Sequence, residues 1–129
     1  MRFAKAVFGI AGIFGVLALT PLYFIYGRIG RLDPPPLTHP QFYYGFAGVA
    51  MAWQFTFFLI ATDPARFRPM MIPSVLEKLI YVGTLVALWM EGRLAFAQVT
   101  FALPDLLLGL LFVVAFWKTT PVAMPDPQT

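Results

Sequence analysis

The sequence predicts an all-α protein, a polytopic membrane four-helix bundle, and three observations lead to this prediction. Of the 129 residues, 60% are hydrophobic and only 12% are charged, about half the charged share of a soluble domain. Apolar runs of nearly the length that crosses about 30 Å of hydrocarbon recur along the chain. Short polar or proline-rich segments separate these runs. We therefore expect one transmembrane domain over residues 1–119, with helices at about 6–26, 43–61, 72–90 and 94–117.

The first predicted helix follows the basic start MRFAK, which resembles the beginning of a signal peptide. No cleavage site of the A-x-A type with suitable flanks follows, and the apolar run continues to Tyr26. We therefore interpret residues 6–26 as a retained membrane helix. Gly9, Ala11, Gly12 and Gly15 give this helix a thin side, which could receive another helix or could simply face lipid.

The segment GRIGRLDPPPLTHPQ is the first break in the apolar pattern. Consecutive prolines cannot continue a helix and favour the extended polyproline conformation, so we expect a stiff connecting loop. The second helix follows at about 43–61, with Tyr43 and Tyr44 as anchors at the membrane interface and Gln54 near mid-span.

The next break, ATDPARFRPMMIPSVLEK at residues 61–78, is unusually rich in charge for this chain. It holds five of the fifteen charged residues, namely Asp63, Arg66, Arg68, Glu77 and Lys78. Asp63 ends the second helix because a residue that precedes proline is disfavoured in helical geometry. Arg66 and Arg68 could bind the phosphates of lipid headgroups, or they could serve only to fix the topology.

The third helix needs part of this charged segment. Leu79 to Met90 gives only 12 uninterrupted apolar residues, which is too few to span a membrane. The helix must therefore begin near residue 72, with Ser74 as its N-cap and Glu77 completing a capping box. This start brings Glu77 and Lys78 to the membrane surface or below it.

A tight turn at residues 91–93, Glu-Gly-Arg, precedes the fourth helix. This helix runs from about Leu94 to Trp117 and is interrupted at Pro104 and Asp105. Residues 120–129 form a polar, proline-rich tail that we expect to be disordered.

The basic residues fall unequally on the two sides of this topology. One side holds Arg2, Lys5, Arg66, Arg68, Lys78 and Lys118, and the other holds Arg28, Arg31 and Arg93. The positive-inside rule then predicts a multi-pass protein of the bacterial inner (plasma) membrane with both termini in the cytoplasm.

One constellation carries ionisable chemistry inside the predicted membrane region. Asp105 lies 13 residues after Gly92, and Lys78 lies 14 residues before it. In an antiparallel helix pair both are about 20 Å from the turn and thus at nearly equal depth. Because a charge in hydrocarbon needs a partner, we predict an intramembrane ion pair between Lys78 and Asp105, with Glu77 one residue further out.

Polar side chains at helical spacing flank this predicted pair. The third helix carries Glu77, Tyr81 and Thr84 on one stripe, and the fourth carries Gln98, Ala102, Asp105 and Gly109. Gln54, Tyr81 and Asp105 could therefore bind a ligand in a small polar pocket in the cytoplasmic half of the bundle. Alternatively, the same side chains only join the helices through interhelical hydrogen bonds.

The composition excludes several classes of site. The chain has no cysteine, which excludes disulfides, thiolate metal sites and iron–sulfur clusters. His39 is the only histidine, so a bis-histidine haem is excluded, and no phosphate loop or Ser-His-Asp set is present. We therefore expect no catalytic residue, no metal and no cofactor, and nothing in the sequence indicates an enzyme. The net charge of +3 suits anionic lipid rather than nucleic acid, and most of the 14 Phe are expected to face lipid.

The segments ATDPARFRPMMIPSVLEK and PDLLLGLLFVVAFWKT, with a basic N-terminus and four short helices, resemble small bacterial four-helix membrane proteins such as the DoxX-type group. This resemblance implies an association with quinone or sulfur-compound redox systems of the membrane, and it transfers no catalytic residue. The small multidrug resistance transporters have a similar length, but they rely on a carboxylate in the first helix, which residues 6–26 lack.

Three functions remain open at this point. The first is an accessory or scaffolding component of a membrane complex, which contacts a membrane-protein partner or a second copy of itself. The second is a binder or carrier of a small lipophilic molecule, such as a quinone or a lipid, held near Gln54, Tyr81 and Asp105. The third is a proton-coupled dimeric transporter that uses Asp105.

Overall fold

The computed structural model describes residues 2–121, and every regular element in that range is helical. Four segments are long and apolar enough to cross a membrane, namely Arg2–Tyr23, Pro40–Thr62, Arg68–Met90 and Phe96–Lys118. Each contains 22 or 23 residues and therefore extends over about 35 Å if helical throughout. Of the predicted tail at 120–129, residues 122–129 lie outside the described residues.

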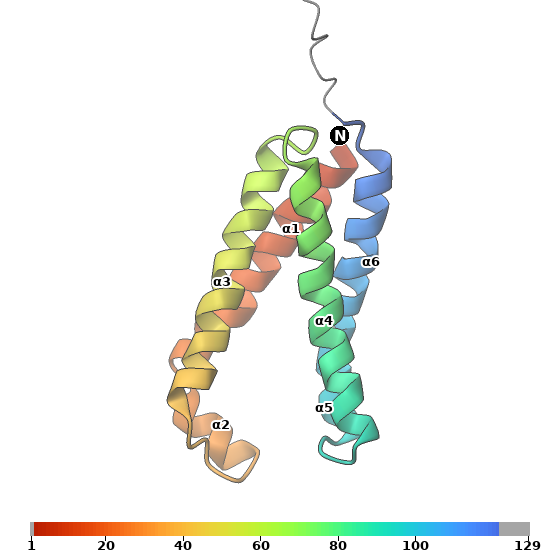
Figure 1. The fold of residues 1–129 in the computed structure, drawn as a ribbon. Helices are drawn as coiled ribbons and strands as arrows, with labels where there is room; N and C mark the ends of the chain where they lie inside the picture. Colours follow the sequence, from red (N-terminus) through yellow and green to blue (C-terminus); the bar gives the residue numbers. More distant parts are fainter. Residues whose placement is uncertain (1, 122–129) are drawn as a thin grey trace, which may run out of the picture.

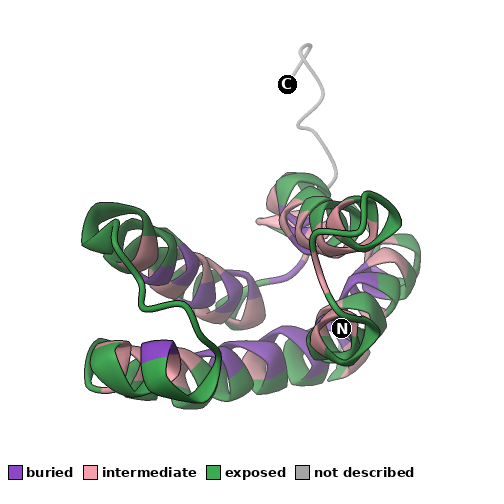
Figure 2. Ribbon diagram, turned by 90° about the horizontal axis from the view of Figure 1, so that it is seen from below, coloured by how far each residue is buried: buried purple, intermediate pink, exposed green. Residues whose placement is uncertain are grey.

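The long helices form two pairs arranged as a V (Figure 1). In one arm, α1 (Arg2–Leu19) packs along α3 (Pro40–Thr62), and in the other, α4 (Met71–Met90) packs along α6 (Leu103–Lys118). The arms meet at the end that holds the N-terminus, where α1 also contacts α6. They separate toward the end that carries α2 (Tyr26–Leu32) and α5 (Phe96–Val99). Buried residues lie on the faces that the helices turn toward one another (Figure 2).

Three phenylalanines from three helices fill the closed end of the V. Phe8 of α1, Phe57 of α3 and Phe112 of α6 are fully buried. The rings of Phe8 and Phe112 stack with centroids 4.2 Å apart, and Phe57 meets Phe112 edge-on at 4.9 Å. These three phenylalanines form the interhelical core and are thus exceptions to the expectation that most of the 14 Phe face lipid.

Small residues allow α1 to lie close to α3. A Cβ atom added at Gly12 would approach the Phe58 ring to 2.5 Å. A Cβ atom added at Gly15 would overlap the Gln54 side chain, whereas Gly9 has open space around it. The thin side predicted for the first helix is thus largely occupied within the chain.

The first long helix ends earlier than predicted and does not continue to residue 26. The α-helix stops at Leu19 and tightens into a 3-10 turn, Thr20–Tyr23. Pro21 is the physical reason, because proline lacks an N–H and its ring clashes with the preceding helical turn. The short helix α2 then occupies Tyr26–Leu32, where we expected loop, since the prolines that break helical structure begin only at residue 34.

The starts of α3 and α4 also differ from the prediction. Helix α3 begins at Pro40, because proline is well suited to the first position of a helix. Helix α4 begins at Met71 after a 3-10 turn, Arg68–Met70. Ser74 is therefore not an N-cap; it lies inside α4 and its hydroxyl donates to the carbonyl of Met70 at 2.8 Å.

The turn after α4 and the break before α6 follow local chemistry. Gly92 adopts a φ of 75°, its N–H donates to the carbonyl of Trp89, and the N–H of Arg93 donates to the carbonyl of Leu88. These bonds form a Schellman motif, in which glycine is favoured at the left-handed position. The fourth segment then consists of α5, a 3-10 turn at Thr100–Ala102, and α6, with the irregular stretch just before Pro104.

Candidate ligand-binding cavity

Helical periodicity directs one lysine of α4 into the interior. The buried residues of α4 are Met71, Ser74 and Lys78, which recur at the spacing of one helix face. The neighbouring helix α6 presents Gly109 to this face, and a Cβ atom added there would lie 3.2 Å from the Lys78 Cβ. Asp105 lies one helical turn before Gly109 on the same helix. The close approach of α4 and α6 thus brings the ammonium and the carboxylate together.

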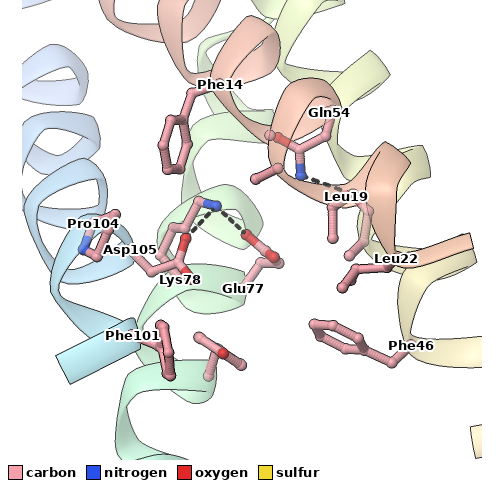
Figure 3. Close-up of a pocket in the computed structure, with 14 residues that line it drawn as sticks. Phe14, Leu19, Leu22, Phe46, Gln54, Glu77, Lys78, Phe101, Pro104 and Asp105 are labelled. Atoms are coloured by element: carbon pink, nitrogen blue, oxygen red, sulfur yellow. Dashed lines mark hydrogen bonds and ion pairs between the residues drawn. The ribbon is translucent and has the colours of Figure 1, made fainter. Parts of the chain in front are cut away.

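The structure places Lys78 in contact with both carboxylates that the sequence singled out. The Lys78 Nζ donates to the Asp105 Oδ1 at 2.8 Å and lies 3.6 Å from the Glu77 Oε2 (Figure 3). Only 4% of Lys78 is exposed, and its Nζ lies 5.2 Å from the centre of the Phe57 ring. The ammonium group is therefore held between the aromatic core and the two carboxylates.

Gln54 faces the same region from the other arm of the V. It is 2% exposed, and its Nε2 donates to the carbonyl of Ala50 in its own helix at 2.8 Å. Its Oε1 lies beside Gly15 of α1 and has no hydrogen-bond partner. A buried amide oxygen without a hydrogen-bond partner is costly, and in Gln54 this atom is packed against the backbone of Gly15.

These residues line a cavity of about 390 Å³ between the two arms. Its volume is within the range of small-molecule sites. The three predicted ligand-binding residues, Gln54, Tyr81 and Asp105, all line it, together with Glu77 and Lys78. The remaining lining is predominantly apolar and consists of Phe14, Gly15, Ala18, Leu19, Leu22, Phe46, Ala50, Phe101 and Pro104. The cavity thus combines an apolar wall with one charged cluster.

The apolar lining was not predicted from the sequence. Phe14 comes from α1, Phe46 from α3 and Phe101 from the 3-10 turn before α6. The rings of Phe46 and Tyr81 lie across from each other with centroids 6.0 Å apart and planes inclined by 20°. In a helix that is apolar on every side, the sequence carries no signal that separates a phenylalanine lining a cavity from one facing outward.

Two other polar residues of the predicted stripes lie away from the cavity. Thr84 is exposed and donates to the carbonyl of Ile80 in its own helix. Gln98 donates through Nε2 to the Asp33 Oδ2 at 2.7 Å, which joins the two arms at the wide end of the V. Both residues lie outside the cavity lining.

The two arginines of the charged segment lie at the closed end of the V and have different surroundings. Arg68 is half-buried; its Nε donates to the carbonyl of Phe116 at 3.1 Å and its guanidinium lies 3.7 Å from the centre of the Phe116 ring. Arg68 therefore caps the last turn of α6, where a cation is favoured by the helix dipole. Arg66 is exposed, and its guanidinium lies 5.3 Å from the centre of the Phe67 ring. Contact of either arginine with a lipid headgroup stays a prediction.

Among the residues that the structure describes, no group of three or more His, Asp or Glu side chains is arranged to hold a metal ion. Comparison of the chain with protein-family models, with curated proteins and with solved structures finds no match. The resemblance to the DoxX-type group therefore remains a prediction from the quoted segments.

Proposed function

We propose that this chain is a multi-pass protein of the bacterial inner membrane that binds a small lipophilic molecule in the cavity between its two arms. The observation that carries the proposal is the position of this cavity. Lys78 is the eleventh residue of the 23-residue segment Arg68–Met90, and Asp105 is the tenth of Phe96–Lys118. If these segments span a bilayer, the charged cluster lies near its centre.

The energetic cost of charge at that depth supports a binding role. An isolated charged side chain at the centre of a membrane helix costs at least about 2.5–3.5 kcal/mol. The cluster keeps this cost tolerable by pairing Lys78 with Asp105 at 2.8 Å. Two helices could be joined without such groups, so ionisable residues at a cavity wall favour a role in binding over a purely structural one.

The other two functions have less geometric support. An accessory component was expected to use thin glycine and alanine faces and the proline-rich outer loop, and of these Gly12 and Gly15 already pack against α3. A proton-coupled transporter was expected to use Asp105, but Lys78 already engages that carboxylate. The topology we propose keeps both termini in the cytoplasm, because Arg2, Arg66 and Lys118 lie at the closed end of the V.

Native mass spectrometry tests the binding function on protein extracted from its own membranes in mild detergent. We expect a small molecule bound to the wild-type chain and lost in Ala18→Phe, because Ala18 lines the cavity and is exposed enough to accept a ring. The matched control is Ala52→Phe, an exposed position on α3 outside the lining, which should retain the molecule. A stoichiometric protein partner without any small molecule would instead support the accessory function.

A further inference from the structure

The formal charges of the cluster in the cavity do not sum to zero. One ammonium group, that of Lys78, faces two carboxylates, those of Glu77 and Asp105. These are the only charged residues in the cavity lining, so the site has a formal charge of −1 when all three groups are ionised. In a medium of low dielectric constant, an uncompensated charge of this kind strongly favours a cationic partner.

The unsatisfied hydrogen-bonding atoms point to the same chemistry as the charge count. Among the described residues, two buried side-chain polar atoms lack a hydrogen-bond partner, the Gln54 Oε1 and the Glu77 Oε2. Both are acceptors, and both residues line this cavity. Asp105, by contrast, already accepts from Lys78, and the Gln54 Nε2 already donates to its own helix. The groups that this region of the cavity wall lacks are therefore hydrogen-bond donors.

The remaining lining suits a cation with an apolar body. The rings of Phe14, Phe46, Tyr81 and Phe101 line the same cavity as the charged cluster. Aromatic faces attract a cation through their quadrupole, and more strongly where water is excluded. The rest of the wall is aliphatic and suits a hydrocarbon tail.

We propose that the cavity binds an amphiphile with a primary ammonium head and an apolar tail. The Glu77 carboxylate accepts an ionic hydrogen bond from the ammonium, and Gln54 lines the cavity on the facing arm. The Lys78–Asp105 pair holds α4 and α6 in position beside it. This inference rests on the proposed binding function and adds the chemical class of the ligand.

Three probes with the same tail and different heads test it: dodecylamine, dodecanol and dodecanoic acid. Each is titrated calorimetrically at pH 7 into the protein in nanodiscs of zwitterionic lipid, with empty nanodiscs as the blank. We expect the amine to bind on the order of tenfold more tightly than the alcohol, and the acid to bind most weakly. Equal binding of amine and alcohol, or tighter binding of the acid, would overturn the inference while leaving a lipophilic binding function in place.

Two variants test which carboxylate gives the preference for the amine over the alcohol. Glu77→Gln should reduce the preference for the amine over the alcohol to nearly one, while its binding of the alcohol shows that the fold and the cavity persist. Glu91→Gln is the control and should keep the full preference for the amine. Glu91 is an exposed carboxylate directly after α4, and it pairs with Arg93 outside the cavity lining. A preference for the amine that survives in Glu77→Gln would contradict the assignment of Glu77. If the wild-type protein binds none of the three probes above the blank, the ammonium proposal fails, and the co-purification experiment with Ala18→Phe decides separately on the cavity.

Discussion

The closed end and the middle of the V are built from the same helices but from different side chains. At the closed end, Phe8, Phe57 and Phe112 are fully buried and in mutual contact. In the middle, the arms face each other across a cavity with Lys78 and Gln54 in its wall. Aromatic packing thus holds the arms together at the closed end, whereas in the middle the arms enclose the cavity in which we propose that a ligand binds.

The largest effect should come from breaking the closed end. Phe112→Ala removes a ring that contacts both Phe8 and Phe57, so it should lower the free energy of unfolding by about 3–5 kcal/mol. The measurement is unfolding in mixed micelles with increasing mole fraction of denaturing detergent. Phe55→Ala makes the same change at an exposed position of α3 and should cost less than about 0.5 kcal/mol. Similar losses in the two variants would show that the aromatic cluster does not hold the arms.

The polar cluster should contribute less, and a double-mutant cycle measures its share. Lys78→Met and Asp105→Asn should each destabilise the protein by about 1–3 kcal/mol. The double variant should lose clearly less than the two losses added together, because the two groups bond directly at 2.8 Å. Glu91→Gln and Arg93→Met form the control cycle on an exposed pair, whose coupling should be below about 0.5 kcal/mol. Additive losses for Lys78 and Asp105 would contradict the interhelical pair.

The smallest effect should come from the contact between Gly15 and Gln54 in the cavity lining. Gly15→Ala places a Cβ atom where the Gln54 side chain lies, so it should cost about 1 kcal/mol through overpacking. The double variant Gly15→Ala/Gln54→Ala should recover part of this loss, because the displaced side chain is then absent. Gly9→Ala, which has open space, should be neutral or slightly stabilising in the same unfolding experiment. A loss at Gly9 as large as that at Gly15 would show that helix flexibility, rather than contact with Gln54, explains the effect.

Apolar composition was enough to predict helical structure and four segments able to cross a membrane, since segment length depends only on hydropathy. The approach of Lys78 to Asp105 could be anticipated because a tight turn at Gly92 fixes the relative depth of residues on either side of it. The presence of Glu77 and Gln54 in the lining of one cavity depends on helical spacing and on how the two arms face each other.

The aromatic core and the apolar cavity wall could not be predicted in the same way. Fourteen phenylalanines are spread over the chain, and a helix that is apolar on all sides has no polar face to reveal which of them point inward. Helix ends were also imprecise, because Pro21 tightens the first helix early and Pro40 starts the next one. Proline marks a boundary in the sequence, but whether it ends or begins a helix depends on its position in the first turn.

The hydrogen bond between Gln98 and Asp33 has a mechanical consequence. Two rigid arms joined at one end act as levers, so a rotation of about 5° at the aromatic cluster displaces points about 25 Å away by about 2 Å. The Gln98 Nε2 and the Asp33 Oδ2 are 2.7 Å apart near the far end of these levers, where Asp33 is exposed. A displacement of that size is enough to break a hydrogen bond. This contact is therefore sensitive to small rotations between the arms, and any change in the angle of the V acts first on the bond between Gln98 and Asp33.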